Sequence, residues 1–168
     1  MSQRGSGYER KELDSYETPE WVTRALLPHL NGAKLIWEPA CGSGKMAAVL
    51  RDAGFDVCAT DIVGGCDFLV QTERADWIVT NPPYAQAQAF IEHALRLAEA
   101  VAMLLRCDFD HAKGRQHLFG KCPAFAKKIV LTRRIVWFDG PKAAPSYNHA
   151  WFLYDHRHRG PPTLAYAP

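Results

Sequence analysis

The sequence predicts an α/β fold built on a mostly parallel sheet, and three stretches of the 168-residue chain predict it. An apolar run at 34–37 leads into a glycine-containing turn and then into a helical pattern. A second apolar run at 55–60 ends at Asp61, and a third at 75–80 ends at Asn81. Strands, turns and helices in this order are typical of sheets that bind ligands at the carboxyl ends of their strands.

Length and composition predict one globular domain over residues 1–168. Hydrophobic residues make up 48% of the chain and charged residues 23%, which is usual for such a domain. We expect residues 1–13 and 156–168 to be loose tails. The apolar stretches, such as 100–105, are too short to cross a bilayer, so no membrane association is expected. No basic start followed by an apolar signal core is visible, which predicts a cytoplasmic protein.

The cysteines predict neither a disulfide framework nor a metal centre. The chain has five, at positions 41, 58, 66, 107 and 122, and no two of them form a CxxC pair. An odd number in apolar surroundings indicates reduced thiols. The seven histidines are not spaced with the cysteines as zinc ligands. We therefore expect no metal site.

Charge is distributed unevenly along the chain. Residues 1–100 hold 9 basic and 14 acidic residues, a balance of −5, and residues 101–168 hold 11 and 4, a balance of +7. A basic half favours a polyanionic partner, although the same residues could simply solvate the surface.

Short apolar runs predict the remaining elements. Strands are expected at 34–37, 55–60, 75–80, 101–105, 127–131, 135–138 and 150–154, with a further strand-like segment at 66–69. Helices are expected from Pro19 to a stop near 28–32, from 46 to 53 and from 86 to 98, with Thr18 as a credible N-cap of the first. The region 108–122 is predicted to be a loop with a short helix.

The tetrapeptide Asn81-Pro82-Pro83-Tyr84 follows the strand at 75–80. The prolines fix φ and remove two backbone donors, which leaves a stiff corner with outward carbonyls. An amide side chain and an aromatic ring flank those carbonyls. This corner suits a planar group that bears an NH2, although a proline-rich turn without chemistry has the same composition.

Together these residues resemble the class I S-adenosylmethionine-dependent methyltransferases, and within them the phage-type DNA N6-adenine methyltransferases. The resemblance covers roughly residues 14 to 154. It implies a Rossmann-like fold, with a mostly parallel seven-stranded sheet, helices on both faces and an antiparallel C-terminal strand. It also implies S-adenosyl-L-methionine as the cofactor, bound by Tyr16, Thr18, Glu38, Pro39, Ala40, Cys41, Gly42, Gly44, Asp61, Ile62, Asp67, Phe68 and Asn81. Asn81, Pro82, Pro83 and Tyr84 match the catalytic motif.

Several of these residues also have a purely structural interpretation. Asp61 could be a strand-end turn residue, Phe68 could be core, and Tyr16 and Thr18 could be a helix cap and its neighbour. In the resembled mechanism, Asn81 and the Pro82 carbonyl accept the two protons of the acceptor NH2, and Tyr84 stacks on its ring.

The substrate follows less directly. The same tetrapeptide occurs in methyltransferases acting on RNA bases and on protein glutamine amides, and a non-catalytic cofactor-binding module is a further alternative. The basic half favours nucleic acid over protein, with seven phosphate-contact candidates at Lys113, Arg115, Lys121, Lys127, Lys128, Arg133 and Arg134. The motif order and the phage-like size favour adenine in DNA. The chain has no room for a long target-recognition region. Only the loops at 108–122 and 139–148 remain for that role, so recognition is expected to be loose, to use a homodimer or to require a partner protein.

Overall fold

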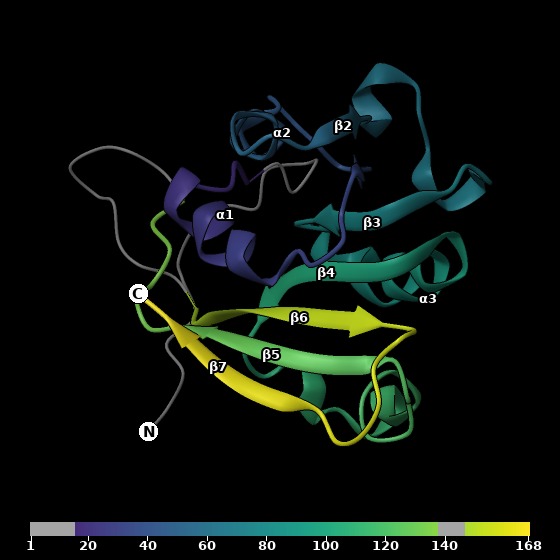
Figure 1. The fold of residues 1–168 in the computed structure, drawn as a ribbon, viewed down its shortest axis with the longest axis vertical. Coiled ribbons are helices and arrows are strands. Elements are labelled where there is room, and N and C mark those ends of the chain that lie inside the picture. The colour runs from purple at the N-terminus through teal and green to yellow at the C-terminus, as the bar shows by residue number, and fades with distance from the viewer. Residues whose placement is uncertain (1–15, 138–146) are drawn as a thin grey trace.

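Seven strands form one sheet in the computed structural model of the chain, which describes residues 16–137 and 147–168 (Figure 1). Their order across the sheet is β2-β1-β3-β4-β6-β5-β7. The strands are β1 (Leu35–Glu38), β2 (Asp56–Ala59), β3 (Ala75–Thr80), β4 (Ala98–Arg106), β5 (Phe125–Leu131), β6 (His149–Asp155) and β7 (Thr163–Ala167).

One strand of the sheet is antiparallel to the others. β1 pairs in parallel with β2 and β3, β3 with β4, and β5 with β7. β6 is antiparallel to both of its neighbours, β4 and β5, and the arrowheads of β3 and β6 point in opposite directions (Figure 1). Because β6 is reversed, its first residue His149 pairs with Arg106 at the end of β4. The predicted fold class, a mostly parallel seven-stranded sheet, is confirmed.

Helices cover both faces of the sheet. Alternate residues of a strand point to opposite faces. On one face, α1 (Glu20–Leu26) and α2 (Lys45–Asp52) pack on Ile36 and Trp77. On the other face, α3 (Ala87–Leu97) packs on Trp37 and Ile78. No helix within the two described ranges is long and apolar enough to span a membrane.

The predicted strands at 34–37, 55–60, 75–80, 101–105, 127–131 and 150–154 are confirmed as β1 to β6, and all three helices lie close to their predicted ranges. Two strand predictions are wrong. At 66–69 the chain forms a 3₁₀ turn (Phe68–Val70), because the Asp67 carboxylate accepts a hydrogen bond from the Leu69 amide. Residues 135–137 form no strand, although Ile135 is buried, and residue 138 lies outside the described ranges.

Two predictions about the ends of the chain are also corrected. Residues 156–168 are not a loose tail, because β7 pairs with β5 from Lys127↔Thr163 to Leu131↔Ala167. Thr18 does not cap α1. The N-cap is Pro19, and no side chain caps that helix. The expectation for residues 1–13 falls outside the part of the chain that the structure describes, as does most of the loop at 139–148.

Candidate active site

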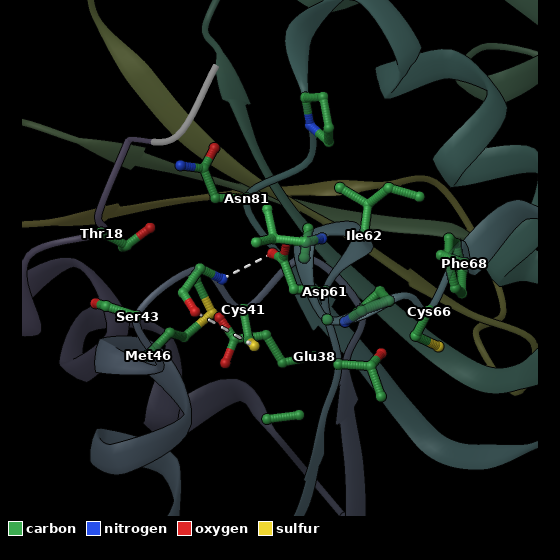
Figure 2. A pocket seen from close by; sticks show the side chains of 18 of the residues that line it. Thr18, Glu38, Cys41, Ser43, Met46, Asp61, Ile62, Cys66, Phe68 and Asn81 are labelled. Atoms are coloured by element: carbon green, nitrogen blue, oxygen red, sulfur yellow. Dashed lines mark hydrogen bonds between the residues drawn. The ribbon is translucent and has the colours of Figure 1, made fainter. Parts of the chain in front are cut away.

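A pocket of about 700 Å³ opens at the carboxyl ends of β1, β2 and β3 (Figure 2). Four segments supply most of its wall: residues 16–18, 38–43, 59–64 and 66–68. Asn81 and Pro83 reach it from the end of β3. Every residue predicted to bind the cofactor lines this pocket except Gly44. The position is the one expected for a ligand site in a parallel sheet.

The turn after β1 is held by two glycines in left-handed backbone conformations. Gly42 has φ 51° and Gly44 has φ 84°, a region that favours glycine. The Gly44 amide donates to the Cys41 carbonyl at 2.8 Å, and the Gly44 carbonyl accepts from Ala48 at 2.9 Å. Gly44 is also the N-cap of α2. It therefore shapes the pocket by turning the chain into the helix and lines none of it.

Asp61 ties this glycine turn to the segment after β2. Its Oδ2 accepts from the Gly42 amide at 2.9 Å, and its Oδ1 accepts from the Val63 amide at 2.9 Å. Each carboxylate oxygen can accept a second hydrogen bond. Asp61 is thus both the turn residue that the structural interpretation describes and an acceptor at the pocket wall.

Glu38 places a buried carboxyl beneath the pocket. Its side chain is 2% exposed, and its Oε2 has no hydrogen-bond partner among the described residues. Burial raises the pKa of this carboxyl from 4.5 to about 8, and the nearby Asp61 charge adds to the increase. Glu38 is therefore mostly neutral near pH 7. A cationic ligand group would favour its ionised form.

The Asn81 side chain is oriented by the segment across the mouth of the pocket. Its Nδ2 donates to the Tyr16 carbonyl at 3.2 Å, and Figure 2 draws the Asn81 side chain near that of Thr18. An ion pair between Glu17 and Lys45 holds the same segment against α2. With Nδ2 engaged, the amide oxygen remains as the acceptor.

Beside the pocket lies an aromatic cluster formed by Tyr16, Tyr84, Trp137 and His149. The Tyr16 ring centroid lies 6.1 Å from that of Tyr84 and 5.5 Å from that of Trp137. Trp137 meets the His149 ring edge-on at 5.2 Å. The Tyr84 hydroxyl is 2.9 Å from Nε2 of His149. A flat group entering next to Asn81 would meet this cluster.

Comparison with solved structures identifies the architecture. One similar structure is a candidate RNA methyltransferase from Pyrococcus horikoshii, with a TM-score of 0.67 and 14% identity, covering 91% of this chain and 92% of that one. A candidate class I S-adenosylmethionine-dependent methyltransferase from Listeria monocytogenes matches with a TM-score of 0.62 and 16% identity, over 89% of this chain and 65% of that one. The M protein of the type I restriction enzyme EcoKI matches with a TM-score of 0.57 and 11% identity, over 92% and 49%.

The chain has the class I methyltransferase fold. No protein-family model and no curated protein sequence matches it. The chain spans nearly all of the Pyrococcus protein but only about half of the restriction-enzyme subunit.

For two predicted residues the structure bears on the alternative interpretations. Phe68 lines the pocket, but the residue is 2% exposed and its ring packs on Trp37, Phe90 and His93, so it is also part of the core. Thr18 is buried and lines the pocket instead of capping a helix. Across residues 16–137 and 147–168, no three His, Cys, Asp or Glu side chains are grouped so as to hold a metal ion.

Five of the seven basic candidates fall into two groups. Arg133 and Arg134 follow β5, whose carboxyl end lies at the same edge of the sheet as Asn81. Lys113, Arg115 and Lys121 lie in the connection between β4 and β5, whose short helix is drawn beside the start of β5 (Figure 1). Arg115 stacks on the Phe109 ring at 3.8 Å and donates to the Phe109 carbonyl. Phe109, Leu118 and Phe119 of this connection are buried in the core.

Lys127 and Lys128 point to internal partners. Lys128 pairs with Asp110 at 2.7 Å and donates to the Cys107 carbonyl, and its side chain is 18% exposed. Lys127 contacts the His29 ring nitrogen at 3.3 Å. These contacts favour a structural role for both lysines.

Trp137, His149 and the Glu17–Lys45 pair were not identified from the sequence as site residues. His149 directly precedes the predicted strand at 150–154 and is the first residue of β6, and its hydrogen-bond partner Tyr84 lies 65 residues earlier. Nothing in the local sequence around His149 indicates that contact, which depends on β6 running against β4.

Proposed function

We propose that the chain is an S-adenosylmethionine-dependent methyltransferase that transfers a methyl group to the exocyclic N6 amino group of adenine in DNA. One observation carries the proposal: Asn81, at the Asn-Pro corner, lines the same pocket as the glycine turn and Asp61. A cofactor in that pocket and an acceptor at the corner would therefore meet. Methyl transfer depends mainly on such alignment, because the sulfonium is a good leaving group.

The pocket residues fit the proposed cofactor. Asp61 retains acceptor capacity for the ribose hydroxyls, and the left-handed glycine turn allows close approach of the backbone. Glu38 lines the pocket, and a positively charged group close to its unpartnered Oε2 would satisfy that oxygen. The cofactor supplies an electrophilic methyl group.

The Asn-Pro corner provides the acceptor side. An aromatic amine is a poor nucleophile because its lone pair is delocalised into the ring. When the Asn81 side-chain oxygen and the Pro82 carbonyl accept its two N–H protons, the nitrogen is drawn towards a tetrahedral form. Asn81 is positioned for this by its bond to the Tyr16 carbonyl. Tyr84 stacks on the ring of a base that has left its duplex.

Nucleic acid is favoured over protein among the substrates that present a planar NH2, and DNA is proposed over RNA on the motif order of the resemblance. Arg133 and Arg134 lie at the pocket edge of the sheet and are suited to contact phosphates beside a flipped base. The EcoKI structure is that of a restriction-enzyme M protein, whereas the Pyrococcus structure is described as a candidate RNA methyltransferase. An RNA base and a protein glutamine amide therefore remain alternatives. Selection of a particular site by a second copy or a partner protein is part of the proposal.

The test is transfer of a tritiated methyl group to duplex DNA, single-stranded DNA, RNA and a protein extract. We expect label in DNA, recovered as N6-methyladenine after digestion. Label only in RNA or only in protein would replace the DNA assignment with that alternative. Cofactor binding without transfer to any acceptor would favour the non-catalytic module.

The two groups of basic residues make a matched pair of variants. Arg133→Ala/Arg134→Ala and Lys113→Ala/Lys121→Ala each remove two exposed positive charges. We expect the arginine variant to lower the slope of log K against log salt for duplex DNA by about 2, and the lysine variant to leave it unchanged. Fluorescence anisotropy at several salt concentrations measures both slopes. Equal slopes for the two variants would remove Arg133 and Arg134 from the proposed interface.

The buried Glu38 makes folding and cofactor binding depend on pH in opposite directions. Its folded-state pKa of about 8 lies above the ordinary value of 4.5. Its contribution to folding is complete below the ordinary value and is lost as pH rises through about 8. Relative to Glu38→Gln, the ligand-free wild type should therefore lose unfolding free energy between about pH 6 and about pH 9. Urea titrations at the two pH values measure this loss.

Affinity for S-adenosylmethionine should rise over the same interval. A cation beside Glu38 favours the carboxylate, so binding releases a proton and tightens with pH, by at most about tenfold per unit. Calorimetry in buffers of different ionisation enthalpy detects that proton, and Glu38→Gln should release none at this site. An equal pH dependence in the variant would assign the proton to another group.

A further inference from the structure

A chain of two hydrogen bonds connects the end of β3 to the start of β6. The Tyr84 hydroxyl lies 2.9 Å from Nε2 of His149, and Nδ1 of His149 lies 2.8 Å from the Tyr147 carbonyl. The residues meet because β6 runs antiparallel to β4, which brings His149 to the edge where β3 and β4 end. Neither bond is formed within one element.

The direction of each hydrogen bond follows from the chemistry of the groups. A carbonyl can only accept, so Nδ1 of His149 carries the hydrogen and donates to Tyr147. Burial lowers the pKa of His149 from 6.5 to about 4, so the ring is neutral near pH 7. A neutral imidazole has one N–H, and Nε2 is therefore an acceptor. The Tyr84 hydroxyl must donate to it.

The surroundings hold the His149 ring in place. The side chain is 1% exposed, and Trp137 packs edge-on against it with an interplanar angle of 82°. The guanidinium of Arg106 stacks on the Tyr147 ring at 3.8 Å and pairs with Asp108 at 2.7 Å. These contacts hold the Tyr147 ring, while its carbonyl accepts the hydrogen bond from Nδ1 of His149. The His149 ring and the Tyr147 carbonyl, which form this end of the hydrogen-bond chain, therefore have defined positions.

We propose that His149 is a positioning residue of the acceptor site. Its Nε2 accepts a hydrogen bond from the Tyr84 hydroxyl and thereby fixes the Tyr84 ring. The inference rests on the proposed function, because it takes Tyr84 as the surface on which the acceptor base stacks. His149 touches neither cofactor nor acceptor. A ring anchored at its hydroxyl loses less freedom when the base arrives, so the anchor lowers the KM for the acceptor more than it changes kcat.

Two conservative variants distinguish the roles of the two ring nitrogens of His149. In His149→Gln, the side-chain oxygen occupies the place of Nε2 and can accept from Tyr84. In His149→Asn, the side-chain NH2 occupies the place of Nδ1 and keeps only the bond to Tyr147. We expect His149→Gln to retain the acceptor KM within about twofold and His149→Asn to raise it about three- to tenfold. Initial rates on unmethylated duplex DNA of mixed sequence give KM and kcat.

A double-mutant cycle with Tyr84→Phe tests whether both residues act through one bond. Tyr84→Phe alone should raise KM about as much as His149→Asn, and the double variant should be no worse than either. Additive effects, or equal KM values for the Asn and Gln variants, would overturn the proposal. The affinity for S-adenosylhomocysteine should stay within about twofold in every variant, since the bond lies outside the cofactor pocket.

The hydrogen-bond chain can be tested without any acceptor. Nitrogen NMR of the histidine rings should show Nδ1 of His149 protonated and Nε2 unprotonated, with Nε2 shifting in Tyr84→Phe. A protonated Nε2 would overturn the proposal even if methyl transfer occurs. If NMR shows the expected protonation of His149 but the protein methylates no acceptor, the proposed function is wrong and the hydrogen bonds of His149 still stand. The NMR measurement on Tyr84→Phe also serves if the His149 variants fail to fold.

Discussion

Replacing Asn81 by alanine is expected to lower the rate of methyl transfer about 100- to 1,000-fold and to leave S-adenosylmethionine affinity within about threefold. The substitution removes the side-chain oxygen proposed to accept an N–H proton of the acceptor, a contact that strengthens as the nitrogen becomes tetrahedral. It also removes the hydrogen bond to the Tyr16 carbonyl. Single-turnover rates with DNA and calorimetric cofactor binding measure the two quantities separately.

Asn81→Asp is the matched control, because it keeps an acceptor oxygen and loses the Nδ2 donor. Its new oxygen faces the Tyr16 carbonyl, which accepts Nδ2 in the native protein, so the side chain must rotate. We expect it to retain more activity than Asn81→Ala and less than the wild type. An alanine variant as active as the wild type would show that the Asn-Pro corner has no part in the reaction. If both variants lose the cofactor, Asn81 acts in cofactor binding or in the structure of the pocket, and its proposed role towards the acceptor falls.

The pocket formed by the proposed cofactor-binding residues could be predicted because most of these residues are close together in the sequence. The sequence pattern of a strand, two glycines and a helix predicts the turn after β1, and Asp61 follows the next strand. Their proximity requires only that β1 and β2 be parallel neighbours, which they are. The Asn81 corner follows from the same topology one strand further along.

The elements that the sequence did not predict mostly depend on contacts over long distances. β7 has the short sequence Thr-Leu-Ala-Tyr-Ala after two prolines, and it becomes a strand only because β5 offers an edge to pair with. The contact between Tyr84 and His149 crosses 65 residues, and no residue near either one signals the other. The 3₁₀ turn at 68–70 is the local exception, since it results from one carboxylate competing for a backbone amide.

Asp61→Ala is expected to weaken the binding of S-adenosylhomocysteine about 100-fold. The variant loses an acceptor proposed for the ribose hydroxyls, and it also leaves the Gly42 and Val63 amides without their partner. Hydrogen bonds to a charged group contribute about 1.5–3 kcal/mol each, and a loss of about 2.7 kcal/mol corresponds to a hundredfold change in affinity. Calorimetry with the purified variant measures the change.

The informative control is Asp67→Ala, because Asp67 is a second carboxylate on the wall of the same pocket. Its Oδ1 accepts one amide, that of Leu69, within its own turn. Asp61 instead joins two segments, the turn after β1 and the segment after β2. If pocket charge alone determined affinity, both variants should weaken binding equally. If the hydrogen-bonded geometry at Asp61 determines affinity, Asp67→Ala should weaken the binding of S-adenosylhomocysteine no more than about fivefold. The difference in affinity between the two variants then measures what the link between the two segments contributes.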